Sequence, residues 1–317
     1  MTDNIVLTII VACFLMAISS VIATIIVMPF KGSLIRLRAN YNPRAVGFDG
    51  SDNTVGPRLT SLIGTMKRTY RLEGWYGLYK GAFPMLAFTM VVSILAVIFV
   101  GANAVRGPKG TYTIPKNGGV GMALFGLVLI VVTLPMTIVI NRAIITPYRL
   151  PLDARESLRI LLSDHERSSP LALFLTPGLL AVVALKSVAT AIVAGMLRLA
   201  LVGNEKKIEK IPIWGLIAFV VFQIVSVAWL CPLEVIMTKL SVQPNLGSEI
   251  SVEDPEGDVP EGLRFAGQGE DVVGLRPTTD PYVGLVDAVR KIMDEEGWQA
   301  LYRGWIWTML GAVFASH

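Results

Sequence analysis

Residues 73–81 read Glu-Gly-Trp-Tyr-Gly-Leu-Tyr-Lys-Gly, and residues 296–304 read Glu-Gly-Trp-Gln-Ala-Leu-Tyr-Arg-Gly. Two copies of one cassette indicate a repeat architecture. Before each copy, apolar residues recur at the spacing of an amphipathic helix. The glycine that ends each copy leads into a strongly apolar segment. The cassette therefore predicts a surface helix, a turn and then a membrane helix.

The composition is that of an integral membrane protein. Apolar residues make up 53% of the chain and charged residues 16%, and the mean hydropathy is +0.60. Five apolar runs each reach the roughly 20 residues that a helix needs to cross a bilayer. They cover residues 5–30, 82–105, 118–140, 171–202 and 211–233, and a sixth, short run begins at Trp305. The first run lacks the basic flank of a signal peptide, so we expect a retained helix.

Catalytic chemistry has little support in the sequence. There are two histidines, and no phosphate-binding glycine loop or Ser/His/Asp set is recognisable. Asp164-His165-Glu166 has no metal-ligand spacing and is predicted to be a solvated charged loop. We expect no catalytic residue, no metal and no cofactor. The net charge of +4 is modest and no dense basic tract is present, so we expect no nucleic-acid partner.

Three of the apolar runs share a pattern of proline and charge. Each contains a proline that is followed seven residues later by a cation, in the pairs Pro29 and Arg36, Pro135 and Arg142, and Pro232 and Lys239. Proline removes a backbone hydrogen bond and clashes with the preceding turn, so we expect a kink at each. Kinked helices in a membrane favour a bundle around a central cavity.

These residues resemble the mitochondrial carrier family. Its signature is a proline, an acid two residues on, basic residues five and seven residues on, and later Glu-Gly, four residues, an aromatic, Lys or Arg, and Gly. The last segment fits best, the first keeps its proline, Arg36 and a complete cassette, and the middle cassette has decayed to residues 173–178. The resemblance implies an all-α membrane protein, a six-helix carrier bundle of three pseudo-repeats with short matrix-side surface helices. The repeats would cover residues 1–105, 106–203 (degenerate) and 204–317, with a short or truncated sixth helix.

In this family, ion pairs between the acid at the second position and the base at the fifth close the matrix side. Here the second positions hold Lys31, Thr137 and Glu234, and the fifth hold Leu34, Ile140 and Met237. Most of these pairs are therefore missing. Because a charge near the membrane core is costly unless paired, a cation should reach Glu234, and Lys31 is the candidate, as a gate or as a structural pair. Arg36, Arg142 and Lys239 complete this predicted gate region, and we expect them to snorkel to the membrane interface, with solute binding as the alternative.

The resemblance also implies solute contacts seven and eight residues after the glycine that opens each even-numbered helix. The predicted substrate-binding residues are Phe88, Leu185, Lys186 and Gly311. Lys186 is the one charge deep inside an apolar run, which makes it a functional hypothesis by default. A lysine there suits an anionic group of a small solute, and a structural partner for Glu234 is the alternative.

In the family, the turns before the even-numbered helices bind cardiolipin. The matching residues are Tyr79-Lys80-Gly81 and Tyr302-Arg303-Gly304. Free backbone N–H groups and the positive end of a helix dipole attract a lipid phosphate there. The alternative is a turn with an interfacial tyrosine anchor.

Residues 241–281 form an acidic insertion, in which Arg264 and Arg276 are greatly outnumbered by Asp and Glu. Its composition predicts a solvated, disordered segment, and docking of a protein partner is the alternative.

The resemblance implies a monomeric, alternating-access transporter of a small metabolite, an anionic one if Lys186 binds it. We expect a multi-pass protein of a mitochondrial membrane, the inner rather than the outer. The alternative is a non-transporting carrier fold that acts as a scaffold or fusion factor of the outer membrane, which the missing ion pairs and the acidic insertion favour.

Overall fold

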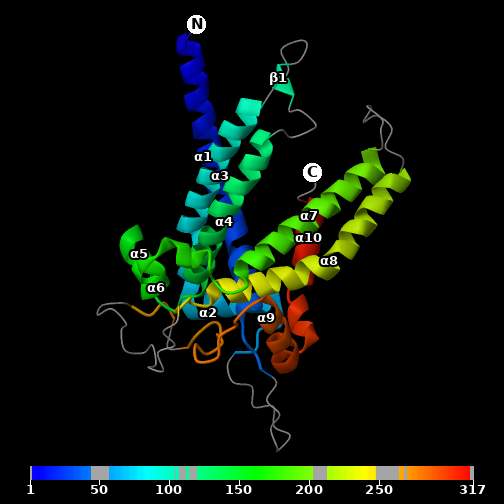
Figure 1. The fold of residues 1–317 in the computed structure, drawn as a ribbon. Coiled ribbons are helices and arrows are strands. Elements are labelled where there is room, and N and C mark those ends of the chain that lie inside the picture. Colours follow the sequence, from blue (N-terminus) through cyan, green and yellow to red (C-terminus); the bar gives the residue numbers. More distant parts are fainter. Residues whose placement is uncertain are drawn as a thin grey trace, which may run out of the picture.

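The computed structural model describes residues 2–43, 57–103, 105–106, 112–113, 120–202, 213–247, 264–267 and 270–314. These residues are mostly helical, with one antiparallel pair of two-residue strands, β1 (Val105–Arg106) and β2 (Tyr112–Thr113). The bundle consists of α1 (Thr2–Ala39), α3 (Ala82–Asn103), α4 (Val120–Ile145), α7 (Leu179–Val202), α8 (Ile213–Val242) and the shorter α10 (Trp305–Phe314) (Figure 1). This confirms the predicted all-α membrane carrier bundle.

Shorter helices gather at one end of the bundle, which we call the surface-helix face. They are α2 (Leu62–Tyr79), α5 (Ala154–Leu161), α6 (Asp164–Ser168) and α9 (Leu285–Lys291) (Figure 1). The 3₁₀ turn η2 (Pro170–Leu173) precedes α7, and the π turn η5 (Ile292–Glu296) and the 3₁₀ turn η6 (Trp298–Tyr302) precede α10. Helices α2 and α9 lie where the amphipathic runs before the two cassettes predict surface helices.

Helices α1, α4 and α8 continue beyond the apolar runs that predict them. Each contains its proline inside the helix and carries its cation in the last turns. In the described residues, four helices are long and apolar enough to cross a membrane, over Phe14–Ala39, Leu62–Phe99, Leu124–Ile145 and Val220–Val242, and a shorter apolar helix covers Leu179–Thr190. The cations therefore lie at the membrane edge of these helices rather than in the loops after them. The kinks stay a prediction.

A glycine with positive φ opens each of α3, α7 and α10. The φ angles are 79° at Gly81, 76° at Gly178 and 75° at Gly304. This left-handed region is costly for other residues. At Gly178 there is also no room, because an added Cβ would lie 2.4 Å from the backbone nitrogen of Leu285. The same turn thus starts a membrane helix in all three parts of the chain, although the middle cassette is degenerate.

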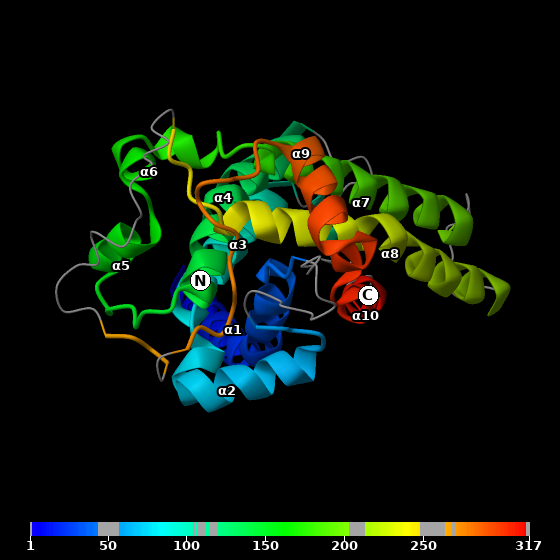
Figure 2. The same ribbon diagram turned by 90° about the horizontal axis from the view of Figure 1, so that it is seen from below.

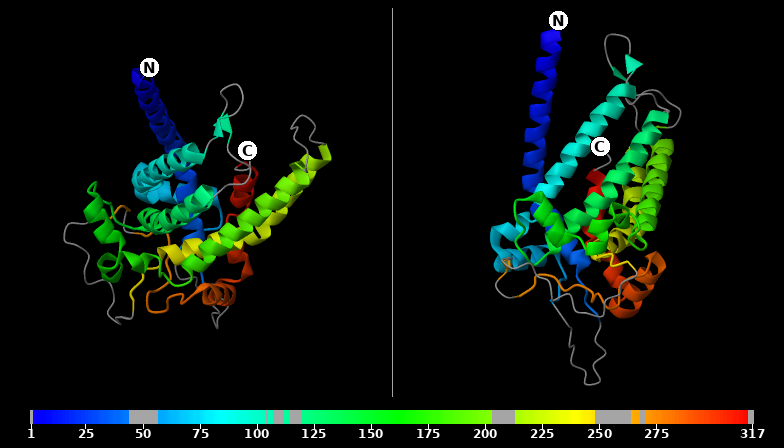
Figure 3. Two further views of the ribbon diagram at one scale, coloured as in Figure 1. Left: turned by 45° about the horizontal axis from the view of Figure 1, so that its top comes forward. Right: turned by 60° about the vertical axis from the view of Figure 1, so that its left-hand side comes forward.

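The packed core lies close to the surface-helix face. Its largest cluster joins α4, α7 and α8 to the residues that precede α10, and it includes the fully buried Leu134, Ile138, Val182 and Ile292. Toward the other end, large apolar side chains of α1 such as Phe14 and Ile22 are exposed on the protein surface, as the hydrocarbon of a bilayer requires. The packed core and the surface helices therefore lie toward the same end of the bundle (Figure 3).

The last part of the acidic insertion is ordered, which corrects the prediction of a solvated segment for the residues that the structure describes. We call residues 264–267 and 270–281 the strap, and residues 248–263 and 268–269 lie outside the described residues. The strap crosses the surface-helix face between α2 and α9 (Figure 2). Val272 and Val273 are buried in a cluster with Leu37 of α1 and Leu59. The prediction from composition is wrong here because the strap is buried by residues from distant parts of the chain.

We expect Val273→Ala to lower the free energy of unfolding by about 1.5 kcal/mol, because it removes two buried carbon groups worth about 0.8 kcal/mol each. Val283→Ala is the matched control, since Val283 is exposed. Thermal unfolding of the purified variants in detergent measures the difference. Equal stability of the two variants would contradict the packed position of the strap.

Candidate functional site

In the first part of the chain, the cation at the end of the membrane helix is paired with the acid of the cassette. The Nη2 atom of Arg36 lies 3.0 Å from Oε2 of Glu73. The Nζ atom of Lys80, which precedes the opening glycine, lies 2.6 Å from Oε1 of the same carboxylate. Arg36 also donates to the backbone oxygen of Gly77 at 2.9 Å. One carboxylate on the surface helix thus binds the membrane helix before it and the turn after it.

The last part of the chain repeats this arrangement. The Nζ atom of Lys239 lies 2.7 Å from Oε1 of Glu296. The Nη1 atom of Arg303 lies 2.9 Å from Oε2 of the same carboxylate. Both Lys239 and Arg303 also donate to the backbone oxygen of Asn40, which joins this group to the end of α1.

The middle part uses a different acid, Glu166 of α6. Its two oxygens lie 2.5 and 2.8 Å from the Nη1 and Nη2 atoms of Arg142, a bidentate pair. Glu166 is only 2% exposed, so the prediction that Asp164-His165-Glu166 is a solvated loop is wrong for this residue. Glu166 and Ser163 form a capping box at the start of α6. The Ser-x-x-Glu spacing is the sequence signal that could have identified it.

The prediction that Arg36, Arg142 and Lys239 snorkel to the interface is also wrong. Their exposed fractions are 1%, 7% and 3%. A carboxylate lies within hydrogen-bond distance of each, and a buried cation that has such a partner has no reason to extend into water. Three equivalent buried ion pairs therefore fasten the surface helices to the ends of α1, α4 and α8.

Glu166 is charged under physiological conditions. Burial by itself would raise the pKa of Glu166, but the hydrogen bonds and the charge of Arg142 outweigh it and hold the pKa below its ordinary value of 4.5. A group whose pKa is lower in the folded state contributes stability above its unfolded pKa, and this contribution is lost as the pH falls through the folded pKa.

We expect Glu166→Gln to destabilise the protein by about 3 kcal/mol, because it leaves the buried charge of Arg142 without a counterion. Glu156→Gln is the matched control, since Glu156 is exposed on α5 and no ion pair is recorded for it in the described structure. Thermal unfolding at neutral pH measures the difference in stability between the two variants. This difference in stability should become smaller below pH 4.5. A difference that does not change with pH would contradict an ionised pair of Arg142 and Glu166.

A second group of charges surrounds Glu234 of α8. Its Oε2 atom lies 2.8 Å from Nη2 of Arg38 and accepts a hydrogen bond from the Thr308 hydroxyl at 2.8 Å. Its Oε1 atom lies 3.0 Å from Nζ of Lys186. We call these four residues the Glu234 cluster. It brings together α1, α7, α8 and α10, so all three parts of the chain contribute.

Lys31 is not the partner of Glu234, contrary to the prediction. Its Nζ atom lies 3.1 Å from the sulfur of Met85 on α3, and no carboxylate partner is recorded for it among the described residues. Arg38 takes the predicted role instead. The sequence reading missed Arg38 because it stands nine residues after Pro29, outside the family spacing. Two basic residues close together at the end of α1, Arg36 and Arg38, were the available signal.

The structure separates the four predicted substrate-binding residues. Lys186 joins the Glu234 cluster and keeps 30% of its side chain exposed. Leu185 lines an apolar groove between α7, α8 and α9 together with Leu285 and Met293. Phe88 packs against a buried cluster of α1 and α4, and an added Cβ at Gly311 would meet no atom within 4 Å. A solute role for these residues stays a prediction, and Lys186 is the one whose charge faces a partner.

The cations of the two predicted lipid turns bind carboxylates of the protein. Lys80 is fully buried on Glu73, and Arg303 binds Glu296. The hydroxyls of Tyr79 and Tyr302 donate to the backbone oxygens of Ile25 and Ala228. Each of these cations therefore already has a carboxylate partner within the protein. Lipid binding at these turns stays a prediction that rests on the backbone at Gly81 and Gly304.

The sequence model of the mitochondrial carrier protein family matches residues 6–102 and 212–317. The chain belongs to this family. It is therefore a carrier-type, multi-pass mitochondrial membrane protein. No curated protein matches the chain. The unmatched residues 103–211 hold Arg142 and Glu166, where the acid lies twelve residues before its glycine rather than eight as in the two cassettes.

Proposed function

We propose that this carrier moves a small anionic solute across the mitochondrial inner membrane by alternating access, with Lys186 as its principal contact. The observation that supports the proposal is the charge balance around Glu234. Arg38 and Lys186 bring two cations to Glu234, which is the one carboxylate that pairs with either of them in the described structure.

The excess of positive charge favours an anionic ligand. A charge inside a membrane protein is costly unless it is paired, and intramembrane lysines commonly mark the path of a solute. Arg38 and Lys186 share a single carboxylate, so the described cluster carries one more positive than negative charge. A carboxylate, phosphate or sulfate group of a solute would lower the cost of holding both charges there.

The geometry suggests how binding could be coupled to movement. An anionic group of the solute takes the place of Oε1 of Glu234 at Lys186, which exchanges one carboxylate-like partner for another. Glu234 keeps Arg38 and the Thr308 hydroxyl on its other oxygen. The bond between α7 and α8 through Lys186 is then free to open, while the bond from α8 to α1 remains. Solute binding thereby loosens one contact between two parts of the chain.

We expect Lys186→Gln to abolish uptake of the transported anion into proteoliposomes, because the solute loses its ionic contact. Folding should be kept, since Glu234 retains Arg38 and Thr308. Lys67→Gln is the matched control, because Lys67 is exposed on α2. The probes are radiolabelled monocarboxylates, dicarboxylates and inorganic phosphate, with an uncharged and a cationic amino acid for comparison, each tested with the wild type first.

Unchanged uptake by the Lys186→Gln variant would refute the role of Lys186. Uptake of an uncharged or cationic solute in preference to every anion would refute the anionic class. If the folded wild type takes up none of the probes, the transport proposal fails and the outer-membrane scaffold becomes the better explanation.

A further inference from the structure

The three buried ion pairs at the surface-helix face each join two residues of the same part of the chain, and hydrogen bonds from Lys239 and Arg303 to Asn40, and from Arg142 to Gln243, add links between parts. Arg36 with Glu73, Arg142 with Glu166, and Lys239 with Glu296 each link a membrane helix to the surface helix that follows it. The strap, in contrast, contacts elements of the first, middle and last parts. It is therefore the segment to consider for closure of this face.

The strap begins against the loop that follows α4. Backbone nitrogens donate from Ala266 to the oxygen of Pro147 at 2.8 Å, and from Arg149 to the oxygen of Arg264 at 2.9 Å. The rings of Tyr148 and Phe265 meet edge to face with centroids 5.1 Å apart. This end of the strap is thus joined to the middle part of the chain like a short strand.

The centre of the strap is joined to the end of α1. The backbone nitrogen of Gly274 donates to Oδ1 of Asn40 at 3.0 Å, and the nitrogen of Tyr41 donates to the oxygen of Gly274 at 2.8 Å. Arg68 of α2 donates to the backbone oxygen of Asp271 at 3.1 Å. These contacts hold the buried Val272 and Val273 against α1.

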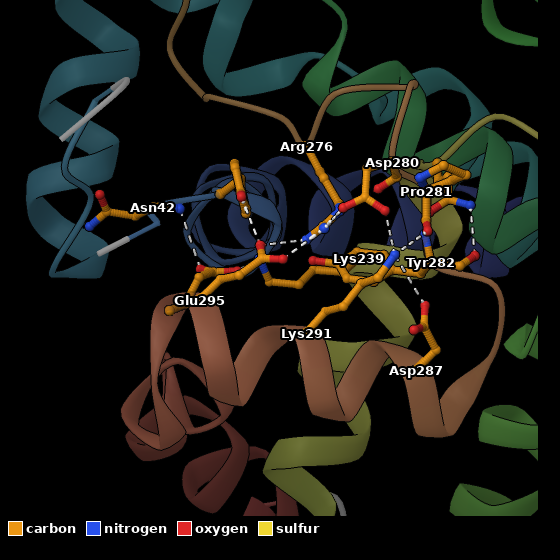
Figure 4. A network of polar contacts seen from close by, with 12 residues as sticks. Asn42, Lys239, Arg276, Asp280, Pro281, Tyr282, Asp287, Lys291 and Glu295 are labelled. Atoms are coloured by element: carbon orange, nitrogen blue, oxygen red, sulfur yellow. Dashed lines mark hydrogen bonds and ion pairs between the residues drawn. The ribbon is translucent and has the colours of Figure 1, made fainter. Parts of the chain in front are cut away.

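Arg276 fastens the far end of the strap to the last part of the chain (Figure 4). Its Nη1 and Nη2 atoms donate to the two oxygens of Glu295 at 2.6 and 2.8 Å. Its guanidinium lies over the rings of Tyr41 and Tyr282, 5.3 and 4.8 Å from their centroids. The hydrogen bonds from Arg276 hold the pKa of Glu295 below its ordinary value, so the pair is charged at neutral pH. A bidentate pair of this kind is geometrically specific and stronger than a single contact.

Cavities on both sides of the strap show that it bridges the face rather than filling it. A cavity of about 490 Å³ lies between the strap, Pro57, Arg68 and Pro147. Another, of about 330 Å³, lies between the strap and the ends of α1 and α8, and Ala39 and Val242 line it. Both cavities are partly open beside the strap, and removal of the strap would take away one of their walls.

We propose that the strap is a latch that holds the bundle closed at the surface-helix face, and that the pair of Arg276 and Glu295 is its clasp. Release of the clasp lets the strap lift from α1 and exposes the end of the bundle beneath it. The latch is a property of this chain's own contacts, and it does not depend on which solute is carried.

The test is the rate at which a maleimide labels single cysteines in the purified full-length chain in nanodiscs, where both faces are accessible. Cys13 and Cys231, the two native cysteines, are first replaced by serine. The reporters are Val273→Cys in the strap and Ala39→Cys beneath it, both at buried positions, and Thr279→Cys is the exposed reference. We expect both buried reporters to react at least about tenfold more slowly than the reference, as for amides and side chains that are protected until a local opening.

Arg276→Gln should raise the labelling rates of both buried reporters several-fold without changing the reference. Glu295→Gln should also raise both rates, and the effects of the two substitutions should be less than additive, because both break the pair of Arg276 and Glu295. Arg276→Gln should have the larger effect, since Arg276 also binds Asp280. The matched controls are Arg290→Gln and Asp294→Asn, neighbouring exposed residues of the same region. The controls should leave all rates unchanged, and circular dichroism checks that the helices remain.

Three results would overturn the proposal. Val273→Cys could react as fast as Thr279→Cys in the otherwise unchanged chain, which would mean that the strap is not closed. Arg276→Gln could leave the rates unchanged, which would exclude it as the clasp. Val273→Cys could become reactive while Ala39→Cys stays protected, which would mean that the strap lifts without opening the bundle.

Discussion

The structure depends on a buried cation at the end of a membrane helix that binds a carboxylate on the surface helix after it. Arg36, Arg142 and Lys239 all do this, with Glu73, Glu166 and Glu296 as their partners. Each pair holds the end of a membrane helix to the surface segment that carries the carboxylate. In the first and last parts, a second cation binds the same carboxylate and sets the turn from which the next membrane helix starts. Because a broken pair leaves a buried charge, each part tolerates little error in this geometry.

Much of the fold could be predicted because it follows from local patterns. The long apolar runs predict membrane helices, and the two cassettes predict a surface helix, a turn and a membrane helix, as α2 with α3 and α9 with α10 show. The partners of the charges were harder to predict. Glu166 looked like part of a solvated loop and Arg38 fell outside the expected spacing. The strap looked disordered because its few apolar residues stand among carboxylates. The partner of Arg38 and the residues that bury the strap come from distant parts of the chain, which composition and spacing do not show. Glu166 is different, because Arg142 lies only 24 residues before it and the Ser-x-x-Glu spacing was a local signal.

Family membership and local charge contribute different parts of the functional argument. The family establishes a carrier-type membrane protein. The proposed class of solute rests on the Glu234 cluster, where one carboxylate holds cations of α1 and α7 and a hydroxyl of α10. In the proposed function, this cluster exchanges one of its contacts for a ligand of the same charge as the carboxylate. Lys186 is the member with the largest exposed fraction among the charged groups, which suits that exchange.

The strap also changes the symmetry of the bundle. In a bundle of three identical parts around one axis, the three boundaries between the parts would open in the same way. A single segment that crosses the face binds the middle part at Pro147, the first part at Asn40 and the last part at Glu295, each through different chemistry. The three boundaries between the parts are therefore not equivalent in the described structure. If the strap acts as the proposed latch, opening begins at the boundary with the weakest attachment and so follows an order that three identical boundaries would not give.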